Sequence, residues 1–434
     1  MHNDRRVSVI GLGYVGLPLA IAFVEAGLEV TGVDESARRV DELLDGRSPI
    51  DDISDDRLQA ALAAGLKIQQ AVATDLRETD AIFVCVPTPI TATKDPDLRP
   101  VLSAAGLIRD GLRPGHLVVL QSTTFPGTTT GPFRAVIEEG GLRAGQEFDL
   151  AYAPERVDPG HPISATRAVP RLVGGVTAGA TDRAATLLRL ICDRVVEVSS
   201  PDVAELAKLF ENVFRNVNIA LVNQLALLCG RMDLDVWEVI DAAATKPFGF
   251  MRFTPGPGVG GHCIPVDPYY LAWRAREFDF VDRFVELAGD INLAMPRYVV
   301  DLVAEALNDR GKAVNGAHVA IIGVAFKPNV KDERNAPSAE VIAGLVERGA
   351  DVRYHDPLVE SFRDANGATY DGHDLPEVVA WADVAVVITA HKAVDFGQLY
   401  ATAGLIVDTV DSSHGHAVRD RQVLRLGAGW TTRA

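Results

Sequence analysis

The chain has 434 residues, enough for two or three domains, and its 47% apolar and 23% charged residues are ordinary for a globular protein with sizeable cores. A formal net charge of -17 argues against a nucleic-acid binder, although it allows a local cationic pocket for phosphates. The four cysteines lack CxxC spacing, so we expect reduced thiols in a cytoplasmic protein rather than disulfides or zinc. The N-terminus enters a strand directly and no uninterrupted apolar run approaches bilayer length, so we expect neither a signal peptide nor a membrane span.

The first half of the chain predicts an α/β domain. Residues 7–10 form a short apolar strand, followed by a glycine-rich turn and a helix that Gly27 closes, and residues 29–34 form the next strand. Apolar runs separated by helical stretches recur as AIFVCVP, HLVVLQS, FDLAYAPE and RLVGG. This alternation predicts a parallel, doubly wound sheet.

The pattern changes near Ser199. Apolar residues then follow helical spacing over a long segment, with Ser200 as the cap and Pro201 in the first turn. We expect one long helix here and further helices to about residue 310. From Ala317 the strand pattern returns in AHVAIIGVAFKPN, ADVRYHD, ADVAVVITAH and GLIVDTV. The predicted fold is α/β, with two Rossmann-like doubly wound domains (1–199 and 313–434) joined by a long central helix in a helical domain (200–312).

The first motif is Gly11-Leu-Gly13-Tyr-Val-Gly16, directly after a strand and opening a helix. Small residues there let the backbone approach a pyrophosphate at the helix N-terminus, which favours anions. Asp34 ends the second strand, where an acid accepts hydrogen bonds from a ribose diol and repels a 2′-phosphate. The motif therefore favours NAD, while Arg38 and Arg39 keep NADP open as an alternative.

The second motif is a lone cysteine in the Gly/Pro-rich loop TPGPGVGGHCIPVDPYYL. Cys263 sits beside His262 and four residues before Asp267, and a cysteine with polar neighbours in such a loop can be a nucleophile. The other three cysteines lie inside apolar runs and are expected to be buried hydrophobes. His262 could suggest a metal site, but no further ligand cluster is visible, so we expect none.

The third motif is a polar stripe on the long helix, made of Lys208, Asn212, Asn216 and Asn223. It lies apart from the apolar stripe, and asparagine is a poor helix former, so a buried stripe facing a site explains it better than a solvated face. Polar groups also follow strand ends, where open α/β sheets bind ligands. They are Ser122-Thr123-Thr124 with Pro126-Gly127, Pro154-Glu155-Arg156, and Phe326-Lys327 with Arg334.

These motifs, in this order, resemble the nucleotide-sugar 6-dehydrogenase family over nearly the whole chain. VIGLGYVGLPLA, VPTP, STTFPGTT, APER, ELAKLFENVFRNVNIALVNQ, GPGVGGHCIPVDPYYL and GVAFKPNVKDERNAP carry the resemblance. It implies an N-terminal NAD domain, a helical spine that forms a homodimer, and a C-terminal nucleotide-sugar domain. It also implies oxidation of a sugar C6 hydroxyl to a carboxylate with two NAD, through a cysteine thiohemiacetal and thioester.

The resemblance also implies roles for individual residues, carried over by position. Lys208 and Asn212 would surround the reacting oxygen, Asp267 would act beside Cys263, Glu155 would activate water for thioester hydrolysis, and Thr123 would hold that water. The cofactor positions are Gly11, Gly13, Tyr14, Val15, Asp34, Arg39, Thr88, Thr123 and Arg334. The substrate positions are Glu155, Arg156, Val157, Lys208, Asn212, Arg252, Gly260, Phe326 and Lys327.

One departure bears on the substrate. UDP-glucose dehydrogenases typically carry lysine where this chain has Val266, and the loop looks like that of the N-acetylhexosamine branch. The sequence-based preference is UDP-N-acetylglucosamine, with UDP-N-acetylmannosamine or UDP-glucose as alternatives. Two other interpretations stay open: a single-step hydroxyacid dehydrogenase of the same layout, and a catalytically silent nucleotide-sugar binder.

Overall fold

The computed structural model describes residues 4–50, 53–91, 95–156, 167–261 and 264–431. The chain forms two compact units, Met1–Glu211 with Tyr269–Val281 and Asn212–Pro268 with Asp282–Ala434, which are taken in turn.

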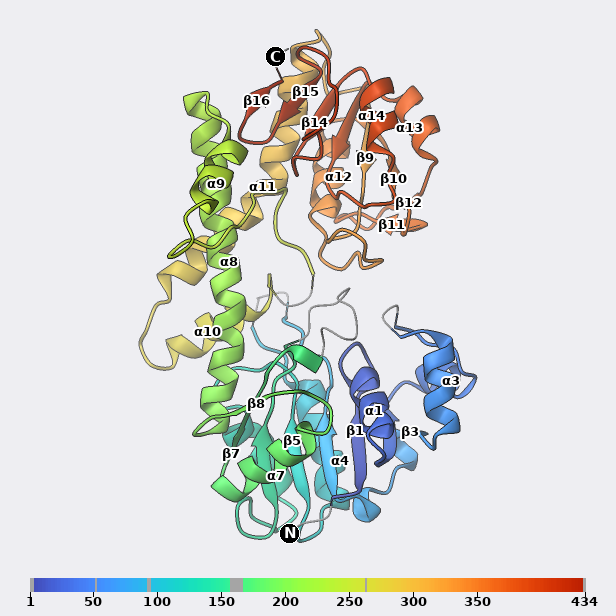
Figure 1. The fold of residues 1–434 in the computed structure, drawn as a ribbon, viewed down its shortest axis with the longest axis vertical. Coiled ribbons are helices and arrows are strands. Elements are labelled where there is room, and N and C mark those ends of the chain that lie inside the picture. Colours follow the sequence, from blue (N-terminus) through green and yellow to red (C-terminus); the bar gives the residue numbers. More distant parts are fainter. Residues whose placement is uncertain (1–3, 51–52, 92–94, 157–166, 262–263, 432–434) are drawn as a thin grey trace. The chain divides into compact units, whose positions relative to one another are not determined.

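The first unit is built on an eight-stranded sheet in the order β3-β2-β1-β4-β5-β6-β7-β8 (Figure 1). Its strands are β1 (Arg6–Ile10), β2 (Glu29–Asp34), β3 (Lys67–Gln70), β4 (Ala81–Val84), β5 (Leu117–Leu120), β6 (Asp149–Tyr152), β7 (Arg171–Gly175) and β8 (Val195–Glu197). The predicted doubly wound domain is confirmed, with one correction. β7 runs antiparallel to β6, whereas the sequence pattern predicted a wholly parallel sheet, because a buried strand of either direction is equally apolar.

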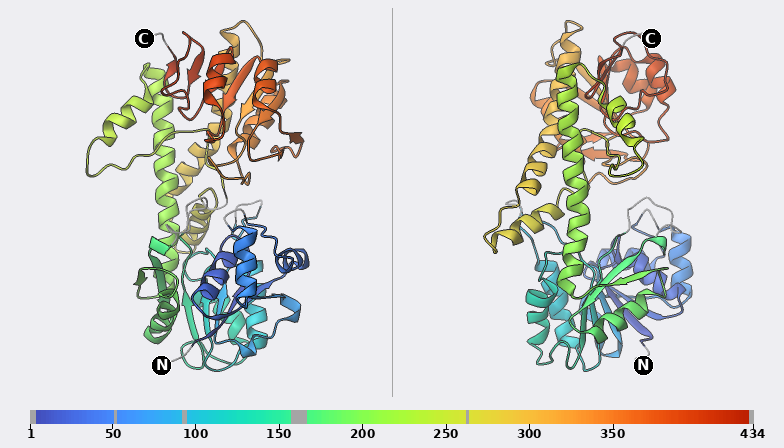
Figure 2. Two further views of the ribbon diagram at one scale, coloured as in Figure 1. Left: turned by 45° about the vertical axis from the view of Figure 1, so that its right-hand side comes forward. Right: turned by 60° about the vertical axis from the view of Figure 1, so that its left-hand side comes forward.

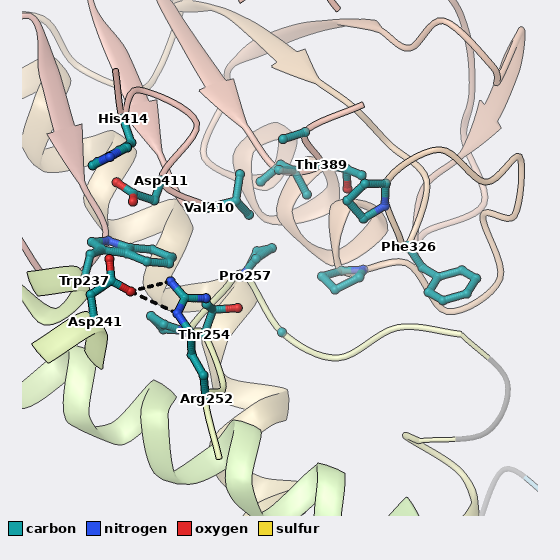
Figure 3. A pocket seen from close by; sticks show the side chains of 16 residues that line it. Trp237, Asp241, Arg252, Thr254, Pro257, Phe326, Thr389, Val410, Asp411 and His414 are labelled. Atoms are coloured by element: carbon teal, nitrogen blue, oxygen red, sulfur yellow. Dashed lines mark hydrogen bonds and ion pairs between the residues drawn. The ribbon is translucent and has the colours of Figure 1, made fainter. Parts of the chain in front are cut away.

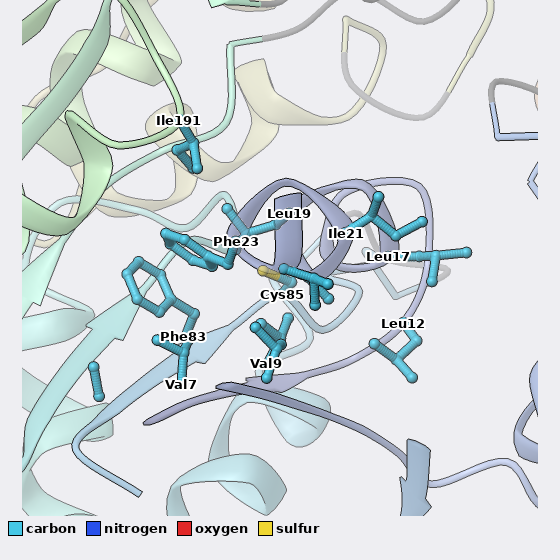
Figure 4. Packing of buried hydrophobic residues seen from close by; sticks show 14 of the residues in the cluster. Val7, Val9, Leu12, Leu17, Leu19, Ile21, Phe23, Phe83, Cys85 and Ile191 are labelled. Atoms are coloured by element: carbon cyan, nitrogen blue, oxygen red, sulfur yellow. The ribbon is translucent and has the colours of Figure 1, made fainter. Parts of the chain in front are cut away.

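Both faces of this sheet are covered by helices. The helices are α1 (Gly16–Glu25), α2 (Ala37–Leu44), α3 (Asp55–Ala63), α4 (Arg99–Gly111), α5 (Arg134–Glu138) and α7 (Ala178–Leu188). Alternate residues of β4 point to opposite faces, so Phe83 packs with α1 and Ile82 packs with α4. Figure 4 shows the first of these cores, where the rings of Phe23 and Phe83 lie 5.0 Å apart.

The long helix α8 (Pro201–Met232) begins where the sequence predicts, with Ser200 Oγ accepting a hydrogen bond from the Val203 amide. It is one uninterrupted helix in every view (Figure 2). The other helices of this region are α9 (Val236–Ala244), α10 (Asp267–Arg276) and α11 (Arg283–Asn308). The expected helices to about residue 310 are confirmed, with the Gly/Pro-rich loop between α9 and α10.

The second unit contains a six-stranded sheet in the order β10-β9-β13-β14-β15-β16. The strands are β9 (His318–Ile322), β10 (Asp351–His355), β13 (Val384–Val387), β14 (Ile406–Asp408), β15 (Val423–Arg425) and β16 (Gly429–Trp430); β11 (Ser361–Arg363) and β12 (Thr369–Asp371) form a separate hairpin. One face packs against α11 and α12 (Pro337–Glu347), and the other against α13 (Leu375–Trp381) and α14 (Phe396–Thr402). β16 is antiparallel to β15, so this sheet is mixed as well.

The two sheets share one local feature at the point where the strand order reverses. A glycine with positive φ follows the inner strand in each, Gly11 (φ 91°) after β1 and Gly323 (φ 80°) after β9. A Cβ on Gly11 would lie 2.7 Å from the Cys85 carbonyl oxygen, and one on Gly323 would lie 2.1 Å from that of Thr389. Only glycine allows the segment after β1 to lie this close to the segment after β4. The same holds for the segments that follow β9 and β13. Open α/β sheets bind ligands at such reversal points.

Candidate functional site

The glycine turn after β1 is shaped for an anionic group. A Cβ on Gly16 would lie 1.8 Å from the Gly11 carbonyl oxygen, so α1 can start this close to β1 only with glycine there. At Gly13 the nearest atom to such a Cβ is 3.9 Å away, which leaves open space beside the turn. No side chain caps the start of α1, where the Leu17 amide donates to the Gly13 carbonyl oxygen at 3.1 Å and Pro18 has no N–H, so a ligand can approach this end of the helix without displacing a capping side chain. The turn therefore fits the pyrophosphate of a dinucleotide.

Asp34, at the end of β2, and Arg39, on α2, support this turn. The Asp34 carboxylate accepts hydrogen bonds from the Leu12 amide (2.9 Å) and from the Ser36 amide (2.9 Å) at the end of β2. Arg39 Nη1 donates to the Leu12 carbonyl oxygen at 3.1 Å, whereas Arg38 pairs with Glu42 on the exposed side of α2. Arg39 therefore lies at the predicted turn and Arg38 points away from it.

A buried carboxylate that the sequence analysis missed holds the segment after β5. Glu205, on α8, accepts hydrogen bonds from the amides of Gly127 (2.7 Å) and Thr129 (2.9 Å) and from the hydroxyls of Thr129 (2.6 Å) and Thr124 (3.3 Å). Burial raises the pKa of Glu205 to about 7, although the hydrogen bonds from Thr129 and Gly127 oppose the rise. This contact fixes Thr124, the neighbour of the predicted site residue Thr123, on the helix that carries Lys208. Glu205 lies three residues before Lys208, so helical spacing could have revealed it.

Glu155 and Arg156, which follow β6, are held by ion pairs. Glu155 Oε2 lies 2.8 Å from Arg171 Nη1, and its Oε1 accepts a hydrogen bond from the Arg156 amide at 2.8 Å. Arg156 Nη2 lies 2.6 Å from Glu211 Oε1 on α8. Arg171 and Glu211 were not predicted, because each is an ordinary charged residue of a strand or helix in the sequence.

Thr88 belongs to the same unit, in the segment after β4. Its carbonyl oxygen accepts a hydrogen bond of 2.9 Å from the buried Tyr270 hydroxyl on α10. The Thr88 backbone is therefore fixed, while its side chain is half-buried.

The polar stripe of α8 is buried, as the sequence predicts. Asn223 and Asn216 both bond to Asn292 on α11: Asn223 Nδ2 donates to Asn292 Oδ1 (2.9 Å), and Asn292 Nδ2 donates to Asn216 Oδ1 (2.8 Å). Asn223 Oδ1 also accepts from the Gly256 amide of the Gly/Pro-rich loop at 2.9 Å. The asparagines therefore satisfy one another inside the unit and tie the loop to the helix.

Asn212 and Asp267 meet at the far end of the same loop. Asn212 Nδ2 donates a hydrogen bond to Asp267 Oδ2 at 2.5 Å, and both side chains are buried. Lys208, one turn earlier on α8, is also buried at 9% exposure. The structure thus brings together two of the predicted catalytic residues, although they are 55 positions apart in the chain.

The loop residue Gly260 packs against the segment after β9. A Cβ on Gly260 would lie 2.7 Å from Phe326 Cβ, and the Gly261 amide donates to the Arg334 carbonyl oxygen at 3.0 Å. Arg334 also forms a two-pronged ion pair with the buried Asp332. Gly260, Phe326 and Arg334 are therefore neighbours in the second unit.

A cavity of about 530 Å³ opens beside this loop in the second unit (Figure 3). Arg252 lies on one side and forms an ion pair with Asp241 of α9 at 2.7 Å, and Phe326 lies on the other. The backbone segment after β13 contributes Thr389 to the wall. The cavity thus combines a cation, a ring and the reversal point of the second sheet, which suits a ligand with an anionic and an aromatic part.

Three residues of the sequence analysis lie outside the described residues: Val157, His262 and Cys263. Within the described ranges, no group of three or more His, Cys, Asp or Glu side chains could hold a metal ion. The other three cysteines are buried as predicted, and burial raises the pKa of each thiol above its usual value. They are held in the inert thiol form.

One helix among the described residues, α8, is long and apolar enough by length and composition to cross a membrane. A core helix of a soluble protein passes the same test. The buried Glu205, Lys208, Asn212, Asn216 and Asn223 lie along one face of α8, and the carboxylate and the three asparagines among them have hydrogen bonds to residues outside this helix. This helix is therefore a core helix of the protein.

Comparison with known proteins identifies the family. Sequence models of the UDP-glucose/GDP-mannose dehydrogenase family match the NAD binding domain at residues 5–191, the central domain at 202–294 and the UDP binding domain at 320–412. The chain is 36% identical to a UDP-N-acetyl-D-mannosamine dehydrogenase of Pyrococcus horikoshii over 89% of each chain. It is also 36% identical to a UDP-N-acetyl-D-glucosamine 6-dehydrogenase of Pseudomonas aeruginosa, over 83% of this chain and 84% of that one.

A solved structure of the UDP-D-ManNAc dehydrogenase from Pyrococcus horikoshii matches with a TM-score of 0.87 and 33% identity, over 98% of this chain and 99% of that one. The relatives lean toward the manno epimer, so they favour the alternative of the sequence analysis over its gluco preference. That preference rested on a loop that both branches share. The protein is an NAD-dependent nucleotide-sugar dehydrogenase, and the chain belongs to the UDP-glucose/GDP-mannose dehydrogenase family.

Proposed function

We propose that the protein oxidises the C6 hydroxyl of a UDP-N-acetylhexosamine to the carboxylate, with UDP-N-acetylmannosamine as the favoured substrate. The similarity to mannosamine dehydrogenases along almost the full chain supports this epimer. UDP-N-acetylglucosamine is the second candidate, supported by the equally identical Pseudomonas relative. Val266, where UDP-glucose dehydrogenases typically carry lysine, supports an N-acetylated sugar over UDP-glucose.

The glycine turn after β1 would hold the dinucleotide. Its open space at Gly13, the uncapped start of α1 and the Asp34 carboxylate would take the pyrophosphate and the adenosine ribose. NAD, when bound, supplies the acceptor for one hydride in each oxidation, so two molecules are used per substrate. Tyr14, Val15, Arg39, Thr88, Thr123 and Arg334 complete the proposed cofactor contacts.

The first oxidation removes a hydride from C6 and a proton from its hydroxyl to form an aldehyde. Lys208 and Asn212 would donate hydrogen bonds to the oxygen as its negative charge develops, and a donor in a buried site is worth more than one in water. The contact of Asn212 with Asp267, which fixes the amide on the buried side of α8, supports this proposed role.

The second oxidation proceeds on the enzyme's own sulfur. The Cys263 thiolate adds to the aldehyde carbon, and the oxygen takes a proton to give a thiohemiacetal. Loss of a second hydride from C6 and of the hydroxyl proton leaves a thioester. Water then attacks the thioester with Glu155 as the base and Thr123 holding the water, which releases the carboxylate and restores the thiol. Asp267 would serve as the proton carrier beside Cys263.

The cavity of the second unit would bind the nucleotide part of the substrate. Arg252 would meet the diphosphate, and Phe326 and Lys327 would contact the uridine. The family resemblance also assigns Gly260, Arg156 and Val157 to the substrate. The match of residues 320–412 to a UDP binding domain and the position of the cavity at the strand-order reversal support this assignment.

The protein would act in the cytoplasm as a homodimer built on α8. Large apolar side chains recur on the helix face opposite the polar stripe, separated by three, four or seven positions: Val203, Leu206, Phe210, Phe214, Leu221, Leu228 and Met232. Phe210 is 63% exposed, and such a stripe is costly in water unless another surface covers it. A second copy of this helix would present a matching stripe.

A substrate panel tests the proposal. UDP-N-acetylmannosamine, UDP-N-acetylglucosamine, UDP-glucose and GDP-mannose are each offered with NAD, and NADH is measured by its absorbance. We expect the highest kcat/KM with the manno sugar and about two NADH per sugar consumed. A ratio of about one would favour the single-step dehydrogenase. UDP-sugar binding without NADH from any substrate would favour the silent binder.

A further inference from the structure

We propose that His391 and Asp356 form a buried pair that holds the loop at 323–329 in the shape that binds the nucleotide. This inference rests on the proposed function, because it deepens the assignment of the cavity to UDP. The two side chains are fully buried, and His391 Nε2 lies 3.0 Å from Asp356 Oδ2. Neither residue was predicted from the sequence, and neither lines the cavity.

The Asp356 carboxylate accepts hydrogen bonds from the backbone amides of two loops. Its Oδ2 accepts from the amides of Val324 (2.7 Å) and Ala325 (3.2 Å), which follow β9, and its Oδ1 accepts from those of Leu358 (2.9 Å) and Val359 (3.1 Å), which follow β10. Burial raises the pKa of Asp356, but the hydrogen bonds from His391 and these amides outweigh it and keep that pKa below its usual value. The carboxylate is therefore ionised and occupied by donors on both oxygens.

His391 is bonded at both ring nitrogens, which sets its tautomer. The Asn329 amide donates to Nδ1 at 3.0 Å, so Nδ1 carries no proton and Nε2 is the nitrogen that donates to Asp356. Asn329 has φ 63°, an unfavourable conformation outside glycine, and its Oδ1 accepts from the Lys392 amide at 2.8 Å. The ring thus connects the two ends of the loop, Val324–Ala325 through Asp356 and Asn329 directly.

The loop held in this way supplies part of the cavity wall. Phe326 and Pro328 line the cavity, and both lie between the bonded residues Ala325 and Asn329. The Thr389 hydroxyl, also at the wall, donates to the Ala325 carbonyl oxygen at 2.6 Å. A change in the pair would therefore move Phe326 and its neighbour Lys327, the two side chains assigned to the nucleotide, without touching a bound ligand.

Two substitutions of His391 test the two hydrogen bonds of its ring separately. In His391→Gln the Nε2 amide can still donate to Asp356, and in His391→Asn the Oδ1 can still accept from Asn329, so each variant keeps one of the two bonds. A third variant, Asn329→Gly, keeps the amide donor and frees the backbone of the exposed end of the loop. The matched control is His318→Gln, at the opposite end of β9, where the ring stacks on Trp381.

UDP alone, without NAD, is titrated into each folded variant by calorimetry, and kcat and both KM values are measured. We expect about tenfold weaker UDP binding in the His391 variants, which is the effect of one lost hydrogen bond. The Asn329→Gly substitution should weaken UDP binding by several fold. The KM for the UDP-sugar should rise while kcat, the KM for NAD and the control stay unchanged.

The outcomes separate this inference from the proposed function. If the wild-type protein binds UDP and the three variants bind it equally well, the pair has no positioning role, whatever happens to their melting temperatures. A defect that is only structural lowers the melting temperature and leaves the UDP affinity of the folded protein unchanged. If the wild-type protein itself binds no UDP, the proposed function of the cavity fails first.

Discussion

The amide of Asn212 donates a hydrogen bond of 2.5 Å to the carboxylate of Asp267, which joins the long helix to the end of the Cys263 loop inside one unit. Asn212 belongs to the polar stripe of α8, and Asp267 belongs to the separate motif of the cysteine loop. The contact fixes the amide of Asn212 and the carboxylate of Asp267 relative to each other, so one bond orients both side chains.

Asp267→Asn tests the proton-carrying role. The neutral amide keeps the size of the side chain but cannot take up a proton, so kcat should fall about 100-fold or more. UDP and NAD affinities should stay close to those of the wild type, because Asp267 is not assigned to either ligand. Steady-state kinetics and ligand titrations measure these effects, and an unchanged kcat would remove Asp267 from the mechanism.

Cys263→Ser tests the covalent step. Serine is a far weaker nucleophile than a thiolate, so the enzyme should stop after the first oxidation. The NADH yield per sugar consumed should then drop from about two to about one, with an aldehyde as product. Release of the carboxylate by this variant at the wild-type rate would contradict the thioester route.

Asn223→Ala tests the buried asparagine cluster. The substitution leaves Asn292 and the Gly256 amide each without one partner, so the free energy of unfolding should fall by about 1–3 kcal/mol in urea titrations. Asn218→Ala is the matched control on the same helix, where the lost bond is exposed and the change should stay within about 0.5 kcal/mol. Equal effects of the two substitutions would mean that the buried cluster adds no stability.

Glu205 predicts a pH dependence of stability. Its pKa is raised by burial from 4.5 to about 7 in the folded protein, so the folded state holds the proton more tightly than the unfolded chain. The stabilisation that the proton on Glu205 contributes is complete below pH 4.5. It is lost as the pH rises toward the folded-state pKa of about 7, by about 3 kcal/mol in total.

Urea unfolding at about pH 5 and about pH 8 checks this sign against Glu205→Gln, which cannot ionise. The wild type should lose more stability across this interval than the variant does. Parallel pH profiles for the two proteins would show that folding does not raise the pKa of Glu205.

Phe210→Glu tests the proposed dimer. A carboxylate within the exposed apolar stripe should favour the monomer in sedimentation, because burying an unpaired charge is costly. Arg215→Glu, an exposed position of α8 away from that stripe, is the control and should leave the oligomeric state unchanged. Identical sedimentation of both variants and the wild type would exclude a dimer through this face.

Much of the fold could be predicted because local patterns decide it. Short apolar runs between helical stretches indicate strands, and the Ser200-Pro201 pair marks the start of α8 before any contact is known. The direction of β7 could not be predicted in this way, because apolar periodicity is the same in parallel and antiparallel strands. The burial of the asparagine stripe could be inferred from residue type, but not its partner Asn292, which is one asparagine among many.

The sequence by itself determined which residue types stand close together in the chain: the glycine turn, Asp34, the Lys208–Asn212 spacing and the cysteine loop are local arrangements that predict the chemistry. Only the tertiary structure decided which distant groups satisfy one another. Glu205 on the 124–129 segment, Asn223 on Asn292, and His391 on Asp356 join residues far apart in the chain. The physical reason is that a buried polar group needs a partner, and chain folding rather than sequence spacing determines which partner is within reach.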